Sequence, residues 1–549
     1  MAYYPIKCPY CLEEMGNYDV LFKVADNSSP EDEVDTLSNK TPVNREEIKA
    51  SRNGTATKAN KEDDSIPQSP VTYSAILAKY RNDTHKIIIN NGKKSRHIPN
   101  KLAHKDISDE SRKDDPSIFQ ITIKKSGESK PLVTFNKRFC KHCKNELDKS
   151  AGQKPTKVIF MLGPSDAGKT VFITALFETL SKSSGYVLPA TESGAQHSMT
   201  INASAYVHNN KAMSNSFETM RKELFNTLGE SEYALIPQTT QNIHDPLTLN
   251  MKLRLYKESK NDGVLLYLRD VPGEWITNEL EFRPEYDKFI SELPGADGFI
   301  MIIDPYTFED SYELFKREDD NPERQAKLRR KCAEKSDYIR KMKERFAIDI
   351  GHIIDENKPT AVVITKGDHV LCKENAGRLR ARGVADLTTF DENQQASLDK
   401  DYFDEVNKDM KLILQKLAPE ALGMLDFNFE NKSYSLVSSF SRDVPFVANK
   451  IVVDGVERDC LNVKYAEPWR IAEPIIQLLM YMEIIPKFHT VSLRTKAETR
   501  GEYKKRNADY INMINAWGTE NCTSWEGYNA KVDKLLDESE VRGRGFWGG

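Results

Sequence analysis

Lys157-Val-Ile-Phe-Met-Leu-Gly163-Pro-Ser-Asp-Ala-Gly168-Lys169-Thr170 is the stretch that decides the fold of this chain. It joins an apolar run to a loop bounded by glycines and then to Val171–Phe177, whose apolar pattern indicates a helix. Glycines let backbone N–H groups close around phosphate oxygens at the start of a helix. Lys169 adds a positive charge for the β- and γ-phosphates, and the Thr170 hydroxyl is a Mg²⁺ ligand. The sequence therefore predicts a nucleoside triphosphate site. Its expected residues are Gly163, Pro164, Ser165, Asp166, Ala167, Gly168, Lys169, Thr170 and Val171.

A second motif ends the next apolar run, Gly263–Asp270. A carboxylate at the end of a buried strand beside a phosphate loop can hold Mg²⁺, usually through water, and Asp270 has this place. Gly273, three residues further on, can offer its N–H to a γ-phosphate and release it after hydrolysis. The two residues predict a loop that senses the terminal phosphate.

A third motif, Thr365-Lys366-Gly-Asp368, follows the apolar run Thr360–Ile364 and predicts base recognition. Asp368 can accept hydrogen bonds from the guanine N1–H and exocyclic amine, while the stem of Lys366 packs against the ring. Adenine offers no such pair of donors and would leave a buried carboxylate without partners. The motif therefore favours GTP as the substrate and makes an ATPase the lesser alternative.

In this order along the chain, the three motifs resemble those of P-loop GTPases of the translation-factor-related (TRAFAC) class. The resemblance covers residues 155–487 and implies an α/β fold, a P-loop NTPase with a mostly parallel central sheet flanked by helices. It also implies a switch threonine that caps Mg²⁺, for which Thr239 and Thr240 are both candidates. Thr240 thus joins Thr170 and Asp270 in the expected Mg²⁺ site.

The same resemblance implies a backbone N–H contact to the guanine oxygen, from Ser438 or Ser439. Two residues depart from the family pattern. Thr365 stands where Asn is usual, which predicts a weaker contact to the phosphate loop and intact guanine recognition. Glu274 replaces the water-positioning Gln, so it either orients or deprotonates water or is a bystander. The expected catalytic residues are Lys169, Glu274 and Thr240.

Long insertions separate these motifs. The run Leu247–Leu255 is expected to form a hairpin with the Asp270 strand, and residues 321–346 to form a charged helix with a solvated face. In the insertion 370–433, one arginine of Arg378-Leu-Arg380-Ala-Arg382 could reach a γ-phosphate in a neighbouring protomer. Such insertions resemble bacterial double-GTPase families of conflict systems, although we find a single phosphate loop.

Two cysteine pairs, Cys8-Pro-Tyr-Cys11 and Cys140-Lys-His-Cys143, have the spacing of zinc knuckles. Residues 25–115 between them are dominated by polar and charged types and predict a largely disordered insertion. Ser117–Ile123 and Pro131–Phe135 predict a small hairpin. We therefore expect a split zinc ribbon with structural Zn²⁺ on four thiolates. Two unrelated cysteine pairs are the alternative, and a thioredoxin-like redox role fits less well.

The expected domains are residues 1–24 with 116–150 (a small N-terminal zinc-ribbon-like β domain), 25–115 (the disordered insertion), 155–487 (the GTPase domain with helical insertions) and 488–549 (a helical, polar tail). The remaining cysteines are scattered, which indicates free thiols in a reducing compartment and a cytoplasmic protein. A formal net charge of −4 on 549 residues gives no overall field for nucleic acid or membrane. The longest apolar stretch, Ile475–Ile485, is too short to span a bilayer and is expected to be the closing helix.

Two classes of function follow from the sequence. The first is a Mg²⁺-dependent, GTP-hydrolysing switch or energy-coupling subunit for a protein partner, with a role in bacterial defence and a homodimer across the nucleotide face as finer expectations. The second is a scaffold that holds GTP with negligible turnover, which Glu274 and the lack of an assignable arginine keep open. We expect the hydrolytic switch, and we do not expect nucleic acid as a primary ligand.

Overall fold

The computed structural model describes residues 4–16, 19–24, 69–80, 85–90, 95–98, 120–164, 167–181, 186–189, 198–207, 211–225, 247–255, 262–277, 281–307, 311–316, 322–372, 375, 377–379, 400–440, 449–453, 456–460 and 466–485. The chain divides into two compact units, residues 1–14 with 150–549 and residues 15–149. Within the described residues, no helix combines the length and the apolar character needed to cross a membrane.

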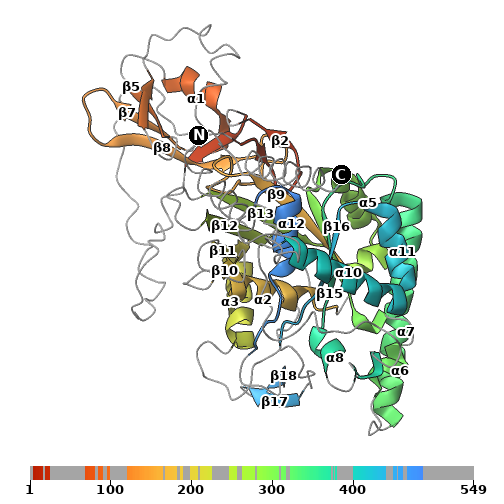
Figure 1. Cartoon of the computed structure of the whole chain (residues 1–549). Helices are drawn as coiled ribbons and strands as arrows, with labels where there is room; N and C mark the ends of the chain where they lie inside the picture. The colour runs from red at the N-terminus through yellow and green to blue at the C-terminus, as the bar shows by residue number, and fades with distance from the viewer. Residues whose placement is uncertain are drawn as a thin grey trace, which may run out of the picture. The chain divides into compact units, whose positions relative to one another are not determined.

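The larger unit is built on an eight-stranded sheet (Figure 1). Its order is β10 (Tyr186–Pro189), β11 (Ser198–Val207), β12 (Leu247–Leu255), β13 (Asp262–Asp270), β9 (Thr156–Leu162), β14 (Gly298–Ile303), β15 (Thr360–Ile364) and β16 (Lys432–Leu436). In the sheet order, the strands β13, β9, β14, β15 and β16 pair in parallel. The strands β10, β11, β12 and β13 pair antiparallel. Strands β14 and β15 are buried along their whole length, as expected for parallel strands with both faces covered. This arrangement confirms the α/β P-loop fold class and the predicted hairpin of β12 with β13.

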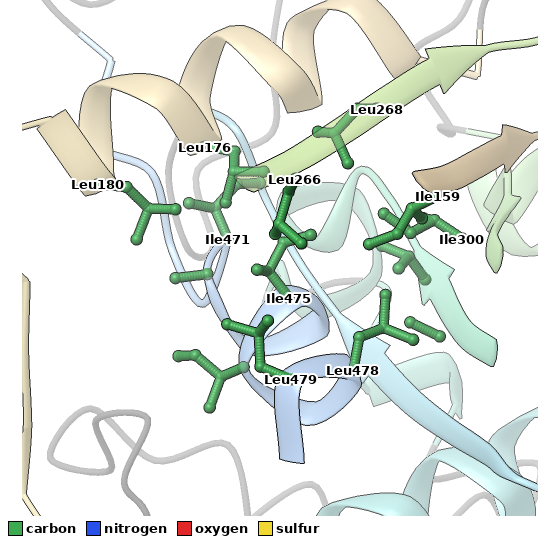
Figure 2. Close-up of a cluster of buried hydrophobic side chains, with 14 of the residues drawn as sticks. Ile159, Leu176, Leu180, Leu266, Leu268, Ile300, Ile471, Ile475, Leu478 and Leu479 are labelled. Carbon is green, nitrogen blue, oxygen red and sulfur yellow. The ribbon is translucent and has the colours of Figure 1, made fainter. Parts of the chain in front are cut away.

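One face of the sheet packs against α12 (Glu473–Tyr481), the expected closing helix. Figure 2 shows Ile475 of this helix beside Leu266 of β13, and Leu478 on the side of Ile159 of β9 and Ile300 of β14. These side chains are fully or almost fully buried. The alternate residues of the strands point to the opposite face because successive side chains of a strand point to opposite sides.

Helices also cover that opposite face. Phe160 of β9 packs against Phe289 of α5 with ring centroids 6.0 Å apart, and Phe299 of β14 against Phe429 at 5.8 Å. The other helices of this unit are α2 (Lys169–Ser181), α3 (Lys211–Phe225), α4 (Gly273–Thr277), α5 (Arg283–Glu292), α6 (Ser311–Phe315), α7 (Pro322–Arg345), α8 (Gly367–Leu371), α10 (Lys400–Leu417) and α11 (Pro419–Asn428). The charged helix expected over residues 321–346 is therefore confirmed as α7. A hairpin of β17 (Asn449–Val453) and β18 (Val456–Cys460) completes the larger unit as described.

The smaller unit contains a six-stranded antiparallel sheet. Its order is β4 (Val71–Thr72), β3 (Leu21–Val24), β8 (Pro131–Phe139), β7 (Gln120–Lys125), β5 (His85–Asn90) and β6 (Ser95–Ile98), with α1 (Tyr73–Tyr80) following β4. The hairpin expected from Ser117–Ile123 and Pro131–Phe135 is confirmed as β7 with β8, for the part that the structure describes. The short strands β1 (Ile6–Lys7) and β2 (Glu14–Met15) flank the first cysteine pair.

Two domain expectations differ from the structure. Residues 69–98, placed in a disordered insertion, contribute β4, α1, β5 and β6, because Ile76, Leu77 and Tyr80 recur at helical spacing and are buried. A compositional average over residues 25–115 hides this short apolar pattern. Residues 1–14, placed with the zinc ribbon, group with the larger unit, where Lys7 forms an ion pair with Asp297 at 2.8 Å. The expected tail, residues 488–549, lies outside the described residues.

Candidate nucleotide site

The phosphate loop runs from the end of β9 at Leu162 to the start of α2 at Lys169. A Cβ on Gly163 would lie 2.7 Å from Cβ of Ile302 in β14, so only glycine allows the loop to pass this close. Gly168 has a positive φ of 86°, which glycine adopts without strain. The two glycines at the described ends of the loop therefore have the close approach and the backbone conformation that favour glycine. The predicted residues Ser165 and Asp166 lie outside the described part of the chain.

Lys169 and Asp270 meet beside this loop because β9 and β13 pair in parallel with Asp270 opposite Met161. The Lys169 ammonium donates a hydrogen bond to the Gly163 carbonyl at 2.8 Å and lies 3.7 Å from Oδ1 of Asp270. Oδ1 of Asp270 is buried and has no hydrogen-bond partner among the described residues. Burial raises the pKa of Asp270, although the neighbouring Lys169 opposes this shift. A buried oxygen of this kind suits a cation.

Thr170, in the first turn of α2, is partly exposed next to Lys169. Its hydroxyl and the Asp270 carboxylate are hard oxygen ligands of the kind that Mg²⁺ prefers. These residues therefore fit the ion that the sequence predicts. The neighbouring Val171 packs its side chain against a small apolar cluster that contains Leu224 and Ala466. Thr239 and Thr240, the candidate switch threonines, lie outside the described residues.

The segment after Asp270 forms the short helix α4, which starts at Gly273. Glu274 occupies its first turn, and its negative charge acts on Asp270 and contributes to the raised pKa there. The structure thus brings Gly273 and Glu274 to the same end of the sheet as the phosphate loop. This placement supports the expected sensing of the terminal phosphate and leaves the chemical role of Glu274 as a prediction.

The residues predicted to recognise the base lie at the ends of β15 and β16. Asp368 is 1% exposed, and the Ser438 hydroxyl donates a hydrogen bond to its Oδ1 at 2.9 Å. The Ser438 backbone N–H donates to the Trp469 carbonyl at 3.1 Å. Since that N–H already has an acceptor, Ser439 is the better candidate of the two for the contact to the guanine oxygen. The third motif and the serines are therefore adjacent in the fold.

Thr365 makes the contact to the phosphate loop for which the family uses Asn. Its Oγ1 donates a hydrogen bond to the Ala167 carbonyl at 2.8 Å, and both residues are buried. A link between the base motif and the phosphate loop therefore exists in this chain. It is made by one hydroxyl rather than by an amide.

Asp304 is a site residue that the sequence reasoning missed. It follows β14 with its carboxylate fully buried, and its Oδ2 accepts a hydrogen bond from the Lys366 ammonium at 2.7 Å. Burial alone would raise the pKa of Asp304, but Lys366 and the Tyr306 N–H hold it below its usual value. The signal was present, since Asp304 ends the strand that neighbours the Lys366 strand. The pair fixes Lys366 at the base-binding end of the sheet.

Helix α7 has the expected charged outer face and, in addition, reaches the site. Its exposed face does carry ion pairs of the kind expected, such as Arg330 with Glu334. Its inner face places the Lys331 ammonium 3.9 Å from the ring centroid of Tyr306, beside Asp304. The same face buries Tyr338, and α7 packs against α4. One helix therefore contacts both the base end and the α4 end of the site.

The arginines of the insertion 370–433 are the expected candidates to reach a γ-phosphate. Arg378 donates hydrogen bonds to the backbone carbonyls of Leu314 and Lys316, which gives it a structural role. Arg380 and Arg382 lie outside the described residues. No arginine of this segment is placed at the phosphate loop by the structure as described.

The two cysteine pairs adopt the same local geometry. Leu12 donates its backbone N–H to the Cys8 carbonyl at 3.0 Å, and Lys144 donates to the Cys140 carbonyl at the same distance. Both donors have a positive φ, 61° for Leu12 and 62° for Lys144. Each Cys-x-x-Cys segment therefore closes in a tight turn that directs two thiols to one side.

These four thiols gather in one place. The sulfurs of Cys8, Cys11, Cys140 and Cys143 all lie within 4.8 Å of one another. The backbone N–H of His142 donates a hydrogen bond to the Cys140 sulfur at 3.4 Å, so this sulfur acts as an acceptor. In a tetrahedral Zn²⁺ site with metal–sulfur distances of about 2.3 Å, the sulfurs are roughly 3.8 Å apart. The donor set therefore fits zinc.

Comparisons with known proteins agree with this geometry. Residues 157–418 match the family model described as Double-GTPase 2. No curated protein matches the chain. Among solved structures, the septin GTPase domain from Chlamydomonas reinhardtii is 12% identical, over 66% of this chain and 98% of that chain, with a TM-score of 0.19. A TM-score this low gives no information on the site, so the support for a GTPase domain comes from the family match.

Proposed function

This chain carries a P-loop GTPase domain, and we propose that the domain works as a Mg²⁺-dependent switch whose GTP-bound state is recognised by a protein partner. The observation that carries the proposal is the buried Oδ1 of Asp270, which lies 3.7 Å from the Lys169 ammonium and has no hydrogen-bond partner in the described chain. A buried carboxylate is destabilising until a cation or donors reach it. Its position directly before α4 couples that cation to the adjoining helix.

The residues around Asp270 have separate roles in this proposal. Asp270 and Thr170 would hold Mg²⁺, with Thr240 as a further ligand, and the bound ion neutralises charge on the β- and γ-phosphates. The Lys169 ammonium, which donates to the Gly163 carbonyl, would stabilise charge on the transferred phosphoryl group. Glu274 would orient the attacking water or accept its proton.

Guanine recognition is assigned to Asp368, Lys366 and Ser439. An Asp368→Asn variant should shift binding from guanine toward xanthine diphosphate, because the new amide donates to the 2-oxo group of xanthine. Competition binding of the two diphosphates measures the shift. The matched control is Ser438→Ala, which removes the hydrogen bond to Asp368 and should weaken binding without changing the preferred base. Unchanged selectivity in Asp368→Asn would mean that the base site lies elsewhere.

We also assign structural Zn²⁺ to the cysteine cluster. Cys8 and Cys140 are fully buried and the other two cysteines are partly exposed, as in a site closed by four thiolates. Such a site would stabilise the turns at Cys8–Cys11 and Cys140–Cys143 directly. The zinc-ribbon region is a docking module for the partner in this proposal.

We base the biological role, the location and the pairing of protomers on sequence features rather than on the geometry of the site. The likeness to double-GTPase families of conflict systems supports a role in bacterial defence, and the free thiols support a cytoplasmic location. Pairing of two protomers across the nucleotide face would supply an arginine to the γ-phosphate. Molecular mass in solution with and without a GTP analogue tests that pairing.

Phosphate release from the purified protein, with Mg²⁺ and either GTP or ATP, tests the central proposal. We expect turnover selective for GTP that Lys169→Ala abolishes. Equilibrium binding of both nucleotides, measured alongside, separates the alternatives. Tight GTP binding without phosphate release would favour a scaffold, and turnover of ATP would contradict the assignment of Asp368.

A further inference from the structure

Tyr338 lies on the inner face of α7 (Pro322–Arg345), which packs against α4 (Gly273–Thr277). Its side chain is buried, with 5% of the residue exposed. The Tyr338 hydroxyl has no hydrogen-bond partner among the described residues. A buried hydroxyl without a partner is destabilising, so its presence in a packed helix interface needs a reason.

Two carboxylates act on this hydroxyl. Burial, together with the negative charges of Glu274 and Asp270, raises the pKa of Tyr338 well above its ordinary value. A tyrosine phenol, with an ordinary pKa of about 10, is protonated near neutral pH, so the Tyr338 hydroxyl is a hydrogen-bond donor. A protonated donor close to carboxylates is suited to bind one of them.

The two carboxylates have different places in the site. Asp270 pairs with Lys169 and belongs to the proposed Mg²⁺ site. Glu274 occupies the first turn of α4, a helix of only five residues that follows the phosphate-sensing Asp270–Gly273 segment. A small shift of so short a helix moves Glu274 relative to α7, which has 24 residues and also packs against α6 and α11.

We propose that Tyr338 is a positioning residue for GTP hydrolysis, whose hydroxyl donates a hydrogen bond to the Glu274 carboxylate in the GTP-bound state and holds it toward the attacking water. The inference rests on the proposed function, because it requires α4 to respond to the γ-phosphate. It assigns the insertion helix α7 a direct part in the switch. The hydroxyl without a partner then has one in the state that turns over.

This inference predicts effects of opposite sign in two states. Tyr338→Phe removes only the hydroxyl and keeps the ring in place. Without nucleotide, the melting temperature should stay the same or rise, because a buried donor without a partner is lost. With GTP, kcat should fall about tenfold while KM changes little, since the hydrogen bond acts on the chemical step. In a Glu274→Ala background the same change should have almost no further effect on kcat.

Tyr312→Phe is the matched control. The Tyr312 hydroxyl donates to Gln325 at the start of α7, so this variant makes the same chemical change away from α4. Its kcat should equal that of the wild type. Equal kcat for Tyr338→Phe and wild type would overturn the inference, and so would a lowered melting temperature without nucleotide, which would indicate a structural partner.

A second readout separates this inference from the proposed function. If the wild type shows no GTP turnover sensitive to Lys169→Ala, the hydrolytic switch itself fails. The rise in melting temperature on adding Mg²⁺ and a non-hydrolysable GTP analogue still tests Tyr338. That rise should be smaller in Tyr338→Phe than in the wild type, and equal rises would exclude a hydroxyl contact made in the GTP-bound state.

Discussion

Thr365 shows at the residue scale how a departure from a motif can preserve its contact. Its Oγ1 donates to the Ala167 carbonyl at 2.8 Å across a sequence separation of 198 residues. Thr365→Val keeps the shape and removes this donor, which leaves a buried carbonyl without it. We expect GDP affinity to fall about five- to tenfold, or roughly 1 kcal/mol, in calorimetric titration. Thr365→Ser should bind as the wild type does, and wild-type affinity in the valine variant would show that the bond does not support the loop.

The ion pair of Asp304 and Lys366 gives a pH-dependent prediction at the same scale. Asp304 is fully buried, and the pairing holds its pKa below the ordinary value. Asp304→Asn should reduce the free energy of unfolding by about 3 kcal/mol at pH 7, because the Lys366 charge loses its partner. The carboxylate stabilises the fold above the unfolded-state pKa of about 3.9 and ceases to do so as the pH falls through the lowered folded-state pKa.

The difference in unfolding free energy between wild type and Asp304→Asn should therefore be constant near neutrality and shrink below about pH 4. Urea denaturation over a pH series measures it. Asp337→Asn is the control, since the exposed Asp337 pairs only with neighbours on α7 and should change stability little at any pH. A difference between wild type and Asp304→Asn that does not vary with pH would exclude a role for the Asp304 charge.

At the scale of elements, α12 stabilises the sheet through its buried side chains. Ile475 and Leu479 are at most 1% exposed and belong to the buried cluster that also contains residues of β9 and β13 (Figure 2). Ile475→Ala and Leu479→Ala should each lower the free energy of unfolding by about 2–5 kcal/mol, because lost burial and the remaining cavity add. Denaturant titration measures this loss. Arg340→Ala, on the exposed face of α7, is the control and should change the free energy of unfolding little. If the α12 variants lost no more unfolding free energy than Arg340→Ala, α12 would not be part of the core.

Elements differ in how well the sequence predicts them. Strands β9, β13, β14 and β15 are short, continuous apolar runs that end in chemically specific residues, so run and motif reinforce each other. Helix α1 and strands β4 to β6 lie in a polar segment, where average composition outweighs a few apolar residues. For α7 the sequence predicts the helix and its solvated face, but not that Lys335 is only 7% exposed or that Lys331 lies over Tyr306, because charged side chains look solvated in a sequence.

At the scale of the whole molecule, the cysteine cluster predicts the metal content of the purified chain. We expect about one zinc per chain by elemental analysis, since four thiolates complete a structural site. The double variant Cys8→Ser/Cys140→Ser should lose this zinc. Cys332→Ser/Cys372→Ser changes two cysteines outside the cluster and should retain it. Fresh protein prepared without chelators that contains no zinc would rule out the site.

The sequence by itself determined the α/β class, the phosphate loop, the guanine motif and the two cysteine pairs, because each depends on residue types at short spacing. Only the tertiary structure decided the partners that lie far apart in the chain: Thr365 with Ala167, Asp304 with Lys366, and helix α7 with helix α4. Those contacts follow from which strand ends meet and which helix packs where. The local periodicity of apolar residues does not specify which strand ends meet or which helices pack together, because many arrangements of strands and helices bury the same apolar side chains equally well.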